Sequence, residues 1–169
     1  GEDMIKHLFQ NILVVVNGSE ASIQAAEYGI LMAKLYRCNL KAVYVVDTAS
    51  LSQLTLGNFF LAEESSLFED NLREDGKRYL DYVAQLGSDK GVTIETELRS
   101  GAVWSEVILS ADEMNAGVIL LGCYECFDGT DFFGNHDDVS SANKEIMAKA
   151  NCSVLIVKEK MIDQLYRLA

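Results

Sequence analysis

The sequence has no proline among its 169 residues, so no turn can use the fixed backbone angle that proline supplies. Its turns must depend on Gly, Asn, Asp and Ser, which tolerate or stabilise turn conformations. No apolar run approaches the ~20 residues that a membrane-spanning helix needs. No leader with a small-residue cleavage site follows Met4. We therefore expect a cytoplasmic protein with no membrane role.

Positive charge is scarce. The chain has 14 Lys and Arg residues against 26 Asp and Glu residues, a formal net charge of −12. Nucleic-acid backbones and anionic lipid surfaces would repel such a protein, so we expect neither as a partner. The four cysteines are too few for a disulfide framework in a chain of this length, and we expect reduced thiols.

Apolar residues, by contrast, are plentiful, at 49% of the chain, which is enough for one core. We expect a single domain over residues 1–169, with its core at about 8–158 and an amphipathic tail at 159–169. Segments of helical periodicity separate five short apolar runs. These runs are residues 12–16, 40–46, 92–98, 118–121 and 154–157.

Strand and helix patterns alternate along the chain, and this order predicts an α/β fold. We expect a single open five-stranded parallel sheet with helices on both faces, joined by right-handed crossovers. Ligands of such sheets bind beyond the carboxyl ends of the strands, where the strand order reverses. The segments after the first and fourth runs are therefore the candidate sites.

Three stretches match the pattern of a known family. They are NILVVVNGSEASIQAAEYGILMAKLYRCNLKAVYVVD, ELRSGAVWSEVILSADEMNAGVILLGCYE and SSANKEIMAKANCSVLIVKE. In order and spacing they resemble the universal stress proteins, and the resemblance covers roughly residues 8–158. It implies the same five-stranded parallel fold. It also implies a homodimer formed through the last strand, Val154 to Val157, and a regulatory protein partner is a further expectation.

Some universal stress proteins bind ATP or a related nucleotide, and the resemblance places their binding pattern on this chain. The family's Asp after the first strand is Asn here, and its second loop glycine is Glu125. The paired residues that follow the loop are both Ser. The positions that match the family's pattern are Asn17, Val45, Leu121, Gly122, Ser140 and Ser141.

The segment from residue 120 to residue 141 is acidic. It has five acids, namely Glu125, Asp128, Asp131, Asp137 and Asp138, and no Lys or Arg. Two like charges ~4 Å apart repel by ~1 kcal/mol in water and by ~4 kcal/mol at an effective dielectric constant of 20. The sequence therefore predicts weak binding of a triphosphate in the manner of the family.

Three hypotheses about function follow. The leading one is a non-enzymatic, dimeric stress-response module with no cofactor, no catalytic residue and no metal ligand. The first alternative is a protein that binds ATP or another adenine nucleotide with Mg²⁺ through a rebuilt phosphate loop, with weak ATPase activity left open. The second alternative is a thiol or metal-binding protein that uses Cys123 and Cys126, with His136 nearby.

Overall fold

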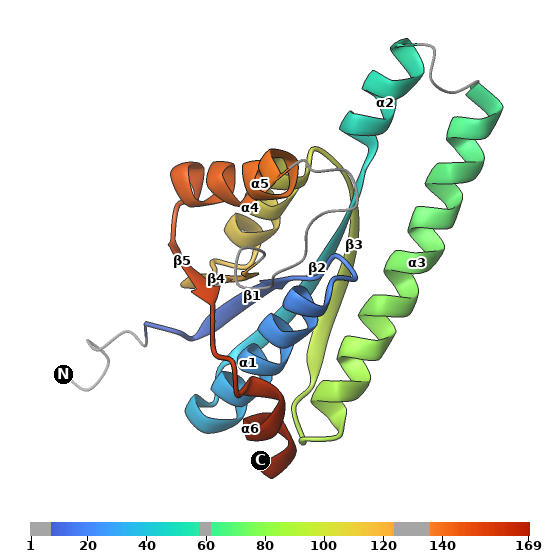
Figure 1. Ribbon diagram of the computed structural model, residues 1–169. Coiled ribbons are helices and arrows are strands. Elements are labelled where there is room, and N and C mark those ends of the chain that lie inside the picture. The colour runs from blue at the N-terminus through green and yellow to red at the C-terminus, as the bar shows by residue number, and fades with distance from the viewer. Residues whose placement is uncertain (1–7, 58–61, 124–135) are drawn as a thin grey trace.

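A five-stranded sheet with all neighbouring strands parallel forms the centre of the computed structural model, which describes residues 8–57, 62–123 and 136–169 (Figure 1). The strand order is β3-β2-β1-β4-β5. The predicted α/β class and the open parallel sheet are confirmed. The strands are β1 (Asn11–Val15), β2 (Asn39–Asp47), β3 (Ile94–Gly101), β4 (Val118–Gly122) and β5 (Ser153–Val157).

Helices cover both faces of the sheet (Figure 1). One face packs on α1 and α3, and the other packs on α4 and α5. The helices are α1 (Glu20–Tyr36), α2 (Thr48–Leu56), α3 (Ala62–Ser88), α4 (Val103–Glu113), α5 (His136–Lys149) and α6 (Ile162–Leu168). None of the helices in the described ranges has the length and apolar composition that crossing a bilayer requires.

Alternation along the strands decides which side chains meet on each face. On β1, Ile12 and Val14 point toward α1 and α3, whereas Leu13 and Val15 point toward α4 and α5. All four are buried. Because both faces of the sheet are covered at its centre, β1 and β4 are nearly continuous apolar runs, as in doubly wound parallel sheets, whereas the edge strand β3 is largely polar.

The structure differs from the sequence prediction at β2, α2 and β3. Residues 47–64 have no clear apolar period, yet α2 forms there because Asp47 caps it and accepts the Ser50 N–H at 3.0 Å. The third strand was expected at residues 92–98, but β3 runs from Ile94 to Gly101. Its pairing with the long β2 continues as far as Asp47 opposite Gly101, and this pairing sets its end.

An ion-pair network holds α4 against the sheet. Arg99 on β3 donates to Glu106 at 2.7 Å and to Glu113 at 3.0 Å, and both acceptors lie on α4. Arg99 also donates to Glu97 at 3.0 Å, and Glu97 pairs with the buried Lys41. These contacts fix the start of α4 beside the carboxyl ends of the strands.

Candidate functional site

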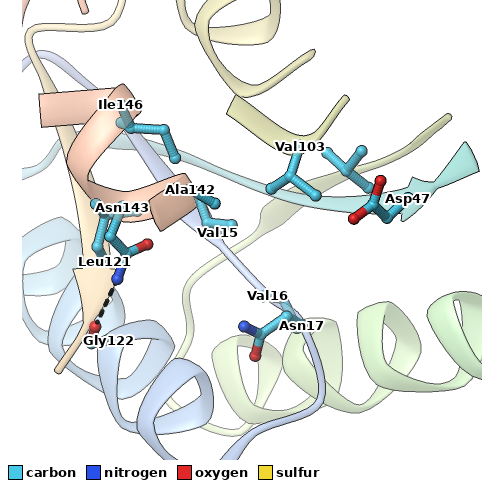
Figure 2. A pocket seen from close by; sticks show the side chains of 11 residues that line it. Val15, Val16, Asn17, Asp47, Val103, Leu121, Gly122, Ala142, Asn143 and Ile146 are labelled. Atoms are coloured by element: carbon cyan, nitrogen blue, oxygen red, sulfur yellow. Dashed lines mark hydrogen bonds between the residues drawn. The ribbon is translucent and has the colours of Figure 1, made fainter. Parts of the chain in front are cut away.

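A cavity of about 190 Å³ opens at the carboxyl ends of β1, β2 and β4 (Figure 2). It lies where β1 stands between β2 and β4, the point at which the strand order reverses. An apolar cavity of about 150 Å³ admits benzene, so this one has room for a flat ring system. Its described lining is Val15, Val16, Asn17, Val45, Asp47, Val103, Leu121, Gly122, Ala142, Asn143 and Ile146.

Strand alternation brings most of the apolar lining together. Val15, Val45 and Leu121 come from three neighbouring strands, and all belong to the face that packs on α4 and α5. The helices complete the wall with Val103 and Ile146. The result is a slot between the sheet, the start of α4 and the middle of α5, with aliphatic side chains on both sides.

The main chain of Val45 faces this slot without a strand partner. The last hydrogen bond between the end of β1 and β2 runs from the Val16 N–H to the Val43 C=O, at 2.9 Å. Main-chain groups alternate in direction along a strand, so those of Val45 point the same way as those of Val43. Within the described ranges, no group of β1 pairs with them. Val45 therefore presents one donor and one acceptor side by side at the edge of the cavity.

The turn between β1 and α1 fixes the side chain of Asn17. The side-chain Oδ1 of Asn17 accepts the Ser19 N–H at 3.0 Å, and the main-chain N–H of Asn17 donates to Ser22 Oγ at 3.2 Å. Ser19 is the N-cap of α1, and its side-chain oxygen accepts the Ser22 N–H at 3.1 Å. With its oxygen engaged, the Asn17 amide keeps its NH₂ group as the donor for the cavity.

Glycine is required in this turn. Gly18 has a φ of +82°, and a Cβ there would lie 2.6 Å from the ring of Tyr79 on α3. The Tyr79 ring stacks on Tyr44 of β2, with ring centroids 6.3 Å apart. The helix α3 therefore packs, through Tyr79, against the turn that carries Asn17.

Gly122 serves helix packing. A Cβ at Gly122 would lie 2.6 Å from the carbonyl carbon of Ala21, so only glycine lets α1 approach the end of β4 this closely. Its carbonyl oxygen accepts a long hydrogen bond from Asn143 Nδ2 at 3.4 Å, which joins α5 to β4 (Figure 2).

The electrostatic character of the cavity is set by amides and one carboxylate. Its described lining holds no Lys or Arg, and its one acidic side chain is Asp47. Both Asp47 oxygens are engaged by Ser50, at 3.0 Å from its N–H and 2.8 Å from its hydroxyl. Among the described residues, no cluster of His, Cys, Asp and Glu could hold a metal ion.

The structure brings four of the predicted site residues together around one cavity: Asn17, Val45, Leu121 and Gly122. Ser140 and Ser141 lie in the second turn of α5, immediately before the lining residue Ala142, and their side chains are outside what the structure describes. Main-chain N–H groups in a second helical turn bond within the helix. Those two residues thus lack the free amides of a helix start.

The predicted thiol and acidic-loop features lie mostly outside the described ranges. Cys126, Glu125, Asp128 and Asp131 belong to that part of the chain. Cys123 is buried and is not a free thiol, so the expectation of reduced cysteines does not hold there. It is confirmed for two others, Cys38 and Cys152.

Sequence reasoning missed seven of the lining residues as site residues, and three of them, Asp47, Val103 and Asn143, show why. A signal existed for Asp47, because it lies two positions after Val45 and so shares its face of β2. Val103 and Asn143 enter from α4 and α5, and their places depend on how those helices dock.

Comparison with known proteins identifies the family. Residues 8–158 match the model of the Universal stress protein family. This chain belongs to that family. Universal stress protein MJ0531 of Methanocaldococcus jannaschii is 29% identical over 156 residues, which cover 91% of this chain and 85% of the relative.

Solved structures of universal stress proteins share the fold. UspA from Lactobacillus plantarum aligns with a TM-score of 0.69 and 22% identity, over 90% of this chain and 100% of the other. A protein from Archaeoglobus fulgidus in complex with dAMP aligns with a TM-score of 0.57 and 18% identity, over 90% and 100%. A universal stress protein in complex with cAMP aligns with a TM-score of 0.57 and 17% identity, over 88% and 96%.

The packing role of Gly122 predicts a large effect of a small substitution. Gly122→Ala should destabilise the protein by about 2–3 kcal/mol, because the new methyl group meets the main chain of α1. Gly29→Ala is the matched control. A Cβ at Gly29 meets only leucine side chains, at 3.1 Å, and alanine favours the helix, so its effect should stay within about 1 kcal/mol. Urea unfolding of both variants measures the difference, and equal stabilities would contradict the packing argument.

Proposed function

We propose that this universal stress protein is a non-enzymatic regulatory module that binds the adenine of a nucleoside or nucleoside monophosphate in the strand-end cavity. The observation that carries the proposal is the unpaired main chain of Val45 beside an aliphatic slot. Adenine has an amino donor and a ring-nitrogen acceptor on its Watson–Crick edge. The Val45 C=O can accept from the amino group of adenine, and the Val45 N–H can donate to its ring nitrogen.

The family comparison supports this class of ligand. The solved complexes with dAMP and cAMP concern proteins of the same fold, and both ligands combine adenine with a single phosphate group. In this chain the walls of the slot are aliphatic, which suits the faces of a purine. The Asn17 amide adds a neutral donor at the rim.

Electrostatics disfavours a longer phosphate chain. The described lining has no cation, and residues 123–143, the segment after β4, contain five acids and no Lys or Arg. The amides of Ser140 and Ser141 fall inside α5 rather than at its start. Each added phosphate therefore brings charge without a matching donor, so ATP should bind more weakly than adenosine or AMP.

The same cavity supports a role without catalysis. Its described lining has no His, Cys, Lys or Ser, the side chains that most often act as base or nucleophile. The single carboxylate, Asp47, is engaged in capping α2. We further propose that the module acts in the cytoplasm.

Isothermal titration calorimetry with adenosine, AMP and ATP tests the ligand. We expect adenosine and AMP to bind with micromolar affinity and ATP, with Mg²⁺ present, to bind at least tenfold more weakly. Ala142→Phe should abolish binding because it fills the cavity, whereas Ala148→Phe, on the exposed side of the same helix, should leave it unchanged. ATP binding as tight as that of adenosine would overturn the proposal.

We propose that the module is a homodimer formed through β5. This strand is at one end of the strand order, and Val154 and Ile156 are only partly buried. An edge strand with apolar side chains is a ready surface for a second strand.

A charge on β5 should separate the subunits. Ile156→Lys should give a monomer by light scattering after size exclusion. Leu98→Lys, at a partly buried position on the opposite edge strand β3, should remain dimeric. Circular dichroism of both variants checks that they fold. A dimeric Ile156→Lys variant, or a monomeric wild-type protein, would show that β5 does not form the contact.

A further inference from the structure

The last helix, α6, packs on the far side of the molecule from the cavity (Figure 1). It contacts α1 and the end of α3, with Ile162 only 1% exposed. The Tyr166 hydroxyl donates to the Leu86 C=O at 2.7 Å, and Lys34 Nζ donates to the Ala169 carbonyl oxygen at 2.7 Å. The helix lies beyond residues 8–158, the part that matches the family. Its docking does not involve the cavity and is independent of the function proposed above.

A carboxyl pair lies in this contact, and of its two members Glu27 is buried and Asp163 is half-buried. Glu27 of α1 is 8% exposed, and its Oε2 has no hydrogen-bond donor among the described residues. Its carboxyl group is within hydrogen-bonding reach of the Asp163 carboxyl group on α6. Two carboxylates this close repel each other, whereas one shared proton turns the repulsion into a hydrogen bond.

The charged groups around Glu27 do not cancel the repulsion between the two carboxyl groups. Burial raises the pKa of Glu27 most, and the hydrogen bond and charge of Asp163 raise it further, to about 8. Arg167, also on α6, opposes this shift more weakly. From the turn that follows α3, Lys90 Nζ lies 4.8 Å from the centre of the Tyr166 ring. Lys34 of α1 binds a main-chain oxygen.

We propose that α6 is a pH-controlled clasp, which docks on α1 when Glu27 and Asp163 share a proton and is weakened when that proton is lost. Docking takes Glu27 from water into a site that favours its protonated form. Released, α6 has only seven residues, too few for a stable isolated helix. Undocking therefore also unfolds it and uncovers the side of α1 that carries Glu27.

The direction of the pH effect follows from linkage. The docked state holds the Glu27 proton up to pH of about 8, whereas a solvated glutamate loses it near 4.5. Between these values the docked state binds more protons, so docking weakens as pH rises. The slope approaches tenfold in the docking equilibrium per pH unit and disappears above about pH 8.

Hydrogen exchange of α6 tests the clasp. The amides of Leu165 and Ala169 bond to Met161 and Leu165 at 3.0 and 3.1 Å, and they exchange when the helix undocks. Their protection factors, which divide out the intrinsic rate of exchange, should fall by up to a hundredfold from pH 6 to pH 8 in the full-length wild-type protein. Glu27→Gln should remove this dependence and raise protection at pH 8, because the Gln amide donates to Asp163 at every pH.

Two further variants make the result decisive. Asp163→Asn should reduce the loss of protection between pH 6 and 8 without abolishing it, because it removes the repelling charge but leaves the burial of Glu27 unchanged. Glu20→Gln, at an exposed carboxyl group on α1, is the control and should keep the wild-type profile. Constant wild-type protection between pH 6 and 8 would overturn the proposal. So would a Glu27→Gln profile as steep as that of the wild type.

Discussion

The candidate site depends on the early end of β1. This strand makes its last bond to β2 at Val16, while β2 continues to Asp47. The chain turns away at Asn17 and Gly18, where the Ser22 hydroxyl accepts the Asn17 N–H and the Asn17 side chain accepts the Ser19 N–H. The main chain of Val45 is left open at that point. A strand that ran two residues further would close the site with an ordinary sheet bond.

The surroundings of this open edge decide what kind of ligand fits it. Aliphatic side chains from three strands and two helices form the walls, and neutral amides stand at the rim. We propose that the acidic segment that follows β4 weakens the binding of extended phosphate chains. On this proposal, the protein binds a base and its sugar more tightly than a triphosphate, and it acts by binding rather than by catalysis.

Much of the fold follows from local sequence, because burial on both faces imposes continuous apolar strands and a helical period between them. The face shared by Asn17, Val45 and Leu121 is set by the same alternation. Contacts between segments far apart in the chain cannot be predicted in this way. Nothing near Glu27 indicates that Asp163 meets it, and nothing near Asn143 indicates that it reaches Gly122. The helix α2 escaped prediction because a capping carboxylate, rather than an apolar stripe, begins it.

The most direct test of the account is the amide resonance of Val45 in a ¹⁵N-labelled protein titrated with adenosine. Without ligand, this N–H lacks a strand partner, so it should exchange readily with water. On binding, it should shift downfield and become protected, because it donates to the ring nitrogen of the base. Adenosine binding that leaves the Val45 amide unshifted and unprotected would contradict the central claim that the unpaired main chain of β2 hydrogen-bonds to the base.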